Sequence, residues 1–207
     1  MIQSRRDFLK NAGKVAVAAS VATVLPMGAL AEKAEHPFTW SHLDPEATAD
    51  RAYASFTSMG GCCIAVADAI IGQLADTVGA PFDGIPVKMF QNGAAGYGQN
   101  SLCGCLGGAA AAIGLVCEAA DSKACLKEVM DWYKTSTLPT YDRGSAPAVA
   151  QVVPGSTECR DSLMEFFKAV PEINYDMKHP DRINRCACLT ADVARKTVEV
   201  LNAKFGV

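Results

Sequence analysis

The sequence predicts an all-α fold, a single-domain bundle of about five to six helices. Three observations lead to this prediction. Apolar residues recur at helical spacing along most of the chain, the breaks between these segments fall at Gly and Pro, and no segment shows the apolar–polar alternation of a strand. The chain also contains nine cysteines, far above ordinary usage.

The first 31 residues have the features of an export signal, and we set them apart from the fold. A charged opening contains the pair Arg5-Arg6, an apolar run extends from Val15 to Leu25, and Ala29-Leu30-Ala31 forms a small-residue cleavage pattern. The arginine pair is typical of the twin-arginine (Tat) route. The apolar run is about half of the roughly 20 residues that a membrane-spanning helix needs. We therefore expect a cleaved Tat-type signal peptide rather than a membrane anchor.

Residues 32–207 should form one helical, cysteine-rich domain in the periplasm or elsewhere outside the cytoplasm. All nine cysteines lie in this part of the chain. Removing the leader takes away four basic residues and one acidic residue, which lowers the formal net charge from −3 to −6. An acidic surface argues against nucleic acid or anionic lipid as a partner. We expect no stable membrane insertion after cleavage.

The first two helices are expected from Pro45 to about Thr57 and from Cys62 to about Val78. Asp44 is a good N-cap and is followed by proline at the first helical position. The second segment, CCIAVADAIIGQLADTV, has helical apolar spacing and stops at Gly79.

A Gly-rich connection from Pro81 to Leu102 follows, and its NGAAGYGQN segment should pack closely over the cysteine site. The next helix, from Cys103 to about Glu118, is so rich in Ala and Gly that we expect it at the centre of the bundle. The remaining helices are expected at Ser122 to about Lys134 with Asp121 or Ser122 as cap, at Cys159 to about Ala169, and at Cys186 to about Lys204.

Four of the six expected helices begin at a cysteine: Cys62, Cys103, Cys159 and Cys186. A helix N-terminus carries partial positive charge and free N–H groups, which stabilise a thiolate. If the bundle brings these ends together, four thiolates converge. Such a site suits an iron–sulfur cluster, in which cysteine sulfur holds each iron.

Several stretches resemble a known family over nearly all of residues 32–207. The order Gly61-Cys62, LCGCLGG, Glu158-Cys159 and Cys186-Ala187-Cys188 resembles the redox-active C_GCAxxG_C_C family. The stretches LDPEATADRAY, GGCC and RCACLTADVA are similar to split-Soret cytochromes c within it. The resemblance implies a helical periplasmic electron carrier, with a homodimer as a possible assembly, a cysteine-ligated iron–sulfur site and, in the cytochromes, two c-type haems. This chain has no C-x-x-C-H motif, so we do not expect covalent haem c.

The family pattern selects Cys62, Cys103, Cys159 and Cys186 as ligands of a [2Fe–2S] or [4Fe–4S] cluster, with Cys63 as the first alternative. Adjacent helical residues point about 100° apart and residues two apart about 200°, so neighbouring thiols such as Cys186 and Cys188 cannot both face one centre. The sequence leaves open which of each pair binds. Some of these cysteines could instead be buried apolar residues or halves of disulfides. His36, His42 and His179 are expected to be solvated or capping residues.

Electron transfer is the function we expect, with a redox partner outside the cytoplasm, and we expect no catalytic residues of a stand-alone enzyme. The alternatives are a thiol–disulfide oxidoreductase using neighbouring thiols such as Cys62-Cys63, and a metal-binding or sensory module with zinc held by four cysteines. Separately, Cys117 should end one helix and Cys125 should lie in the first turn of the next, which predicts a disulfide between them.

Overall fold

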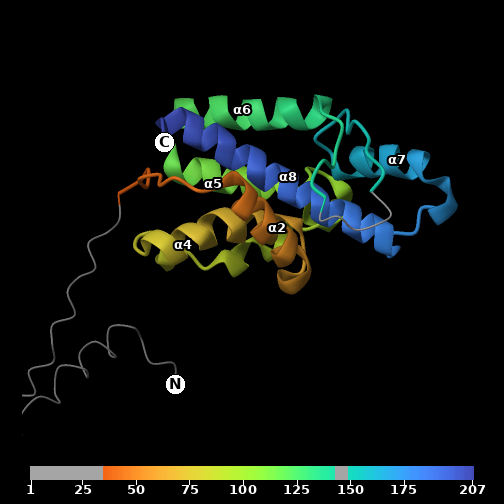
Figure 1. Cartoon of the computed structure of the whole chain (residues 1–207), viewed down its shortest axis with the longest axis horizontal. Coiled ribbons are helices and arrows are strands. Elements are labelled where there is room, and N and C mark those ends of the chain that lie inside the picture. The colour runs from red at the N-terminus through yellow and green to blue at the C-terminus, as the bar shows by residue number, and fades with distance from the viewer. Residues whose placement is uncertain (1–34, 143–148) are drawn as a thin grey trace, which may run out of the picture. The chain divides into compact units, whose positions relative to one another are not determined.

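The longest helix among the described residues, α8 (Pro180–Phe205), crosses the bundle and packs against helices α2, α3, α5 and α6 (Figure 1). The computed structural model describes residues 35–142 and 149–207. The predicted leader lies outside the described residues. Within them the α-helices are α2 (Pro45–Met59), α3 (Cys62–Ala67), α4 (Gln73–Val78), α5 (Gly104–Val116), α6 (Ala119–Thr135), α7 (Cys159–Ala169) and α8.

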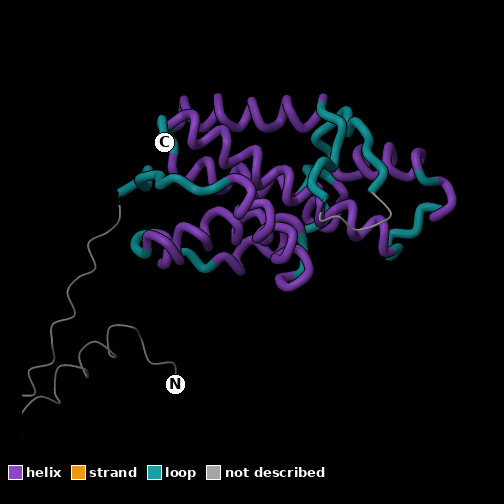
Figure 2. The backbone as a smooth tube through the Cα atoms, in the orientation of Figure 1, coloured by secondary structure: helices purple, strands orange, loops and turns teal. Residues whose placement is uncertain are grey.

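The described residues contain helices and loops but no strand, which confirms the all-α prediction (Figure 2). Extended pairing in this part of the chain is limited to two isolated antiparallel bridges, Leu102 with Glu158 and Leu138 with Val152. No described helix has the length and apolar character needed to cross a membrane.

Helix α2 begins as the sequence predicts, with Pro45 at its first position and the Asp44 carboxylate accepting a hydrogen bond of 2.7 Å from the Ala47 N–H. The predicted second helix is continuous from α3 through a π-helical turn, Asp68–Gly72, into α4. Arg51 of α2 donates to both carboxylate oxygens of Asp68 at 2.9 and 3.0 Å. This ion pair fastens the π-helical turn to α2.

The connection before α5 contains three short helical turns, Phe82–Gly84, Val87–Gly93 and Gly96–Asn100. Helix α5 lies in the interior, against α3, α6 and α8, as its small residues predict. At Gly108 an added Cβ would lie 2.5 Å from the Cys63 carbonyl oxygen. Glycine is needed there because α5 and α3 approach each other so closely.

Two helices begin earlier than the sequence predicts. Helix α6 starts at Ala119 with Glu118 as N-cap, so the expected cap at Asp121 or Ser122 is wrong. Helix α8 starts at Pro180, six residues before Cys186, because proline suits the first helical position and the His179 side chain caps the Asp181 N–H at 3.3 Å. Cys186 therefore lies in the second turn of α8 and not at its N-terminus, which corrects that prediction.

The predicted disulfide between Cys117 and Cys125 is not formed, and all nine cysteines are free thiols. Cys117 is the C-cap of α5 in an extended conformation. Because α6 begins at Ala119, Cys125 lies in its second turn rather than its first. The two thiols nevertheless interact: burial, together with the neighbouring Cys125, raises the pKa of Cys117 to about 11.

Candidate metal centre

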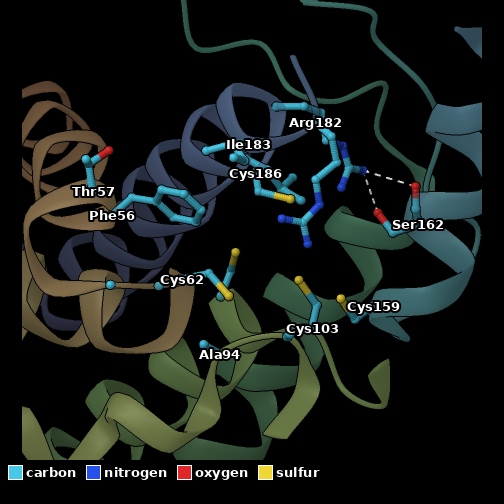
Figure 3. A pocket seen from close by; sticks show the side chains of 16 residues that line it. Phe56, Thr57, Cys62, Ala94, Cys103, Cys159, Ser162, Arg182, Ile183 and Cys186 are labelled. Carbon is cyan, nitrogen blue, oxygen red and sulfur yellow. Dashed lines mark hydrogen bonds between the residues drawn. The ribbon is translucent and has the colours of Figure 1, made fainter. Parts of the chain in front are cut away.

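One cavity of about 370 Å³ contains all four cysteines that the sequence singled out (Figure 3). Cys62, Cys103, Cys159 and Cys186 line it, and Figure 3 shows their sulfurs around a common space. We call it the cysteine cavity. Its walls come from the α2–α3 turn, the Gly-rich connection, and helices α5, α7 and α8; they also include Phe56, Thr57, Gly60, Gly61, Ala94, Ala95, Cys105, Ser162, Arg182, Ile183, Arg185 and Leu189.

Cys62 is the first residue of α3, and the backbone before it requires glycine. Gly61 has a φ of +149°, and an added Cβ would lie 2.6 Å from the Ala94 Cβ. The Gly-rich connection therefore lies directly against the start of α3. Ala94 and Ala95 line the cavity, as expected for a segment packed over the cysteine site.

Cys103 and Cys159 come from segments far apart in the sequence that the bridge between Leu102 and Glu158 joins. Cys103 is the N-cap of α5, and Cys159 is the first residue of α7. Both side chains are buried. Two helix N-termini are thus placed side by side, each with a cysteine at its start.

Cys63 and Cys188 do not line the cysteine cavity. Both are buried elsewhere, Cys63 beside Gly93 and Gly107, and Cys188 in a small apolar cluster with Ala49 and Ala191. Neighbouring thiols in a helix point in different directions. The geometry therefore places Cys62 and Cys186, rather than Cys63 and Cys188, at the cavity.

Cys105 is a fifth cavity thiol that the sequence analysis left out of the ligand set. It is 1% exposed, and its Sγ lies 3.4 Å from the Thr190 hydroxyl of α8. In a helix the side chains of residues two apart point about 200° away from each other, which would keep Cys103 and Cys105 from facing one cavity. Cys103 is the N-cap of α5 and has non-helical backbone angles, so this restriction does not apply to the pair. The dihedral angles of a cap residue could not be read from the C-x-C spacing alone.

The pKa values of the cavity thiols are shifted in different directions. A hydrogen bond from Cys105 lowers the pKa of Cys103 to about 6, assisted by Tyr133 and by the charge on Arg185. The same donor lowers the pKa of Cys62. The pKa of Cys105 is correspondingly raised well above its ordinary value, chiefly because its single S–H can donate to Cys103 or to Cys62. Cys103 and Cys62 are therefore the preferred thiolates.

The other two cysteines favour the protonated form when no cation is nearby. Burial raises the pKa of Cys159 to about 12, and the neighbouring Cys103 adds to this effect. Burial also raises the pKa of Cys186, although Arg185 and Arg182 oppose the shift. Metal binding to these thiols would release protons.

The cavity wall also holds a buried cation, Arg185, which the sequence analysis did not single out. Arg185 is 1% exposed and donates to the Ser162 hydroxyl at 2.6 Å and to the Ser162 carbonyl at 3.3 Å, shown as dashed lines in Figure 3. The Tyr133 hydroxyl also donates to Ser162, at 3.1 Å. The sequence RCAC places an arginine next to a proposed ligand cysteine, but only the fold shows that the arginine side chain is buried.

The donor set suits iron or another thiophilic metal: five thiols, two of them favoured as thiolates, around one space with a buried cation beside them. In residues 35–142 and 149–207, no three Cys, His, Asp or Glu side chains are close enough to hold a single metal ion. A tetrahedral zinc site would need sulfur–sulfur distances of about 3.8 Å, given Zn–S bonds of about 2.3 Å.

The fold and the cavity define the class as an all-α protein built around a cysteine-lined site. Residues 62–200 match the family model described as "Putative redox-active protein (C_GCAxxG_C_C)", and the chain belongs to this family. The match covers all four cysteines of the family pattern, and it confirms the resemblance drawn from the motifs.

Two comparisons lead to the same relative. The chain is 29% identical to the split-Soret cytochrome c of Desulfovibrio desulfuricans, over 97% of this chain and 78% of the relative. It is also similar to a solved structure described as "A novel iron centre in the split-Soret cytochrome c from Desulfovibrio desulfuricans ATCC 27774". The TM-score is 0.75 at 27% identity, covering 82% of this chain and 72% of that one.

Proposed function

We propose that this chain is an exported electron-transfer protein that holds an iron–sulfur cluster through Cys62, Cys103, Cys159 and Cys186. The observation that carries the proposal is the convergence of these four cysteines, from four helices, on one cavity. The solved relative described as having a novel iron centre supports iron as the metal. When bound, such a cluster accepts and releases single electrons.

The residues around the cavity serve this function in distinct ways. Helix N-termini at Cys62 and Cys103 add to the lowered pKa of these two thiols and favour thiolate sulfur. Ala94 and Ala95 cover one side with small side chains. Phe56 and Ile183 also line the cavity, and Ile183 is 40% exposed, so a partner protein could approach at Ile183.

Location and partners complete the proposal. The leader with Arg5-Arg6 and Ala29-Leu30-Ala31 supports export by the Tat translocase to the periplasm or another extracytoplasmic site. The Tat route carries folded proteins, which suits insertion of a cluster before export. The electron donor or acceptor is then a protein outside the cytoplasm.

Anaerobic purification followed by visible absorption and by iron and acid-labile sulfide analysis tests the proposal. Broad, overlapping visible bands with iron and sulfide in comparable amounts are expected. A sharp Soret peak would indicate haem instead. A colourless protein that takes up neither iron nor sulfide on anaerobic reconstitution would overturn the proposal.

A second candidate is thiol–disulfide exchange by Cys103 and Cys105, favoured by the lowered pKa of Cys103 beside a protonated thiol. The Cys103 thiolate would attack a substrate disulfide and release one substrate thiol, and Cys105 would then release the other, leaving a protein disulfide. Insulin reduction with dithiothreitol separates the two functions. Activity that Cys105→Ser abolishes without loss of iron would favour this candidate.

A further inference from the structure

Arg185 is a buried cation whose hydrogen bonds go to no carboxylate among the described residues. It is 1% exposed, and both of its hydrogen bonds go to the neutral residue Ser162. Its Nε is buried and has no hydrogen-bond partner. Burying a cation without a counter-charge is costly, so such a residue usually faces an anion.

The surroundings of Arg185 point to the cysteine cavity as the place for that anion. Arg185 lines the cavity and immediately precedes Cys186. The cation therefore lines the same cavity as the four proposed ligand cysteines.

The position of Arg185 is fixed by α7 and α6. Ser162 lies one helical turn after Cys159, and its hydroxyl receives the hydrogen bonds of both Arg185 and Tyr133. The Arg185 guanidinium also lies 5.7 Å from the ring centroid of Phe166. These contacts hold the side chain in one orientation.

We propose that Arg185 is the counter-charge of the cavity's anionic occupant, and that it raises the reduction potential of the iron–sulfur cluster. This inference rests on the proposed function. A thiolate-ligated cluster is anionic and gains one further negative charge when one electron enters, with no bond made or broken. A fixed cation nearby therefore stabilises the reduced form more than the oxidised form. The same pairing makes occupancy of the cavity stabilise the fold, because a bound cluster adds negative charge beside this buried cation.

The test compares Arg185→Met and Arg185→Lys with Arg160→Met as the control. Arg160 follows Cys159 as Arg185 precedes Cys186, but its side chain is 68% exposed, so its charge is screened by water. Midpoint potentials of the anaerobically reconstituted proteins are measured by redox titration. Iron retention against a chelator and the melting temperature of the metal-free proteins are measured in parallel.

Arg185→Met should lower the midpoint potential, speed iron loss by about 10-fold or more, and leave the melting temperature of the metal-free protein unchanged or higher. Arg185→Lys should lie between Arg185→Met and the wild type, and Arg160→Met should match the wild type. Wild-type potential and iron retention in Arg185→Met would overturn the inference while the cluster itself stands. A wild-type protein that binds no iron would instead overturn the proposed function, and with it this inference.

Discussion

Cys103 and Cys159 are joined by a pair of backbone hydrogen bonds that run in opposite directions between their two segments. The Cys103 N–H donates to the Thr157 carbonyl at 2.8 Å, and the Cys159 N–H donates to the Ser101 carbonyl at 2.6 Å. The pair fixes the spacing of two proposed ligands before any metal binds. A site preorganised in this way loses little conformational freedom when it is filled.

Replacing cavity cysteines should remove iron, whereas replacing their sequence neighbours should not. Cys103→Ser, Cys159→Ser and Cys186→Ser each delete one proposed ligand, so we expect iron retention to fall by at least about 10-fold, measured by metal analysis after anaerobic reconstitution. The matched controls are Cys63→Ser and Cys188→Ser, whose thiols lie outside the cavity. Full iron occupancy in all three cavity variants would refute the ligand set.

Two glycines of α5 should respond in opposite ways to alanine. At Gly104 an added Cβ would lie 2.5 Å from both the Cys62 sulfur and the Gly93 carbonyl oxygen. Gly104→Ala should therefore displace a proposed ligand, reduce iron binding and cost about 1–3 kcal/mol of stability. Gly114 has open space around it, so Gly114→Ala should raise the free energy of unfolding by about 0.5–1 kcal/mol. Urea unfolding measures both effects, and equal behaviour of the two variants would contradict the packing described for α5 and α3.

The ion pair at the π-helical turn should make the protein lose stability in acid. Burial raises the pKa of Asp68, but hydrogen bonds from Arg51 and Ser55 outweigh this effect and hold the pKa below its ordinary value of 3.8. A carboxylate with a lowered folded-state pKa contributes stability above the unfolded-state pKa, and this contribution disappears as the pH falls through the folded-state value. Unfolding free energies measured from pH 6 down to about pH 2.5 should show this loss.

Asp68→Asn should be less stable by about 1–3 kcal/mol at pH 6 and should lose less stability on acidification. Asp131→Asn is the control, because Asp131 also has a lowered pKa but lies outside the π-helical turn. Hydrogen bonds from Lys127 and Lys134 lower the pKa of Asp131 to about 2 on the exposed face of α6. It should have little effect at pH 6, because exposed ion pairs contribute little. If Asp68→Asn loses as much unfolding free energy on acidification as the wild type does, other carboxylates are responsible for the acid sensitivity.

The arginine pair in the leader should decide the export route. Replacing Arg5 and Arg6 with lysine keeps the charge but removes the pair that characterises the Tat route. The variant should accumulate uncleaved in the cytoplasm, as shown by cell fractionation and by mass spectrometry of the N-terminus. Unchanged export and cleavage of the lysine variant would rule out the Tat route for this chain.

The sequence by itself determined the helical class, most helix positions and four of the five cysteines at the cavity. These features depend on local patterns: the Asp44-Pro45 start of α2, the apolar spacing from Cys62 to Val78, and the buried stripe of α8 that includes Leu189, Val193, Val198 and Leu201. The family motif added the choice of cysteines, because its pattern comprises the residues that converge in the fold.

Only the tertiary structure decided how the cavity is completed. Cys186 reaches it from the second turn of α8, Cys105 enters it from α5, and Cys63 is turned away from it. The direction of each side chain depends on where its helix begins and on the angle at which helices cross, and neither is encoded in the spacing of cysteines. The burial of Arg185 could not be predicted from the sequence for the same reason. It depends on contacts with Ser162 and Phe166 of α7, which lie beside Arg185 only after folding.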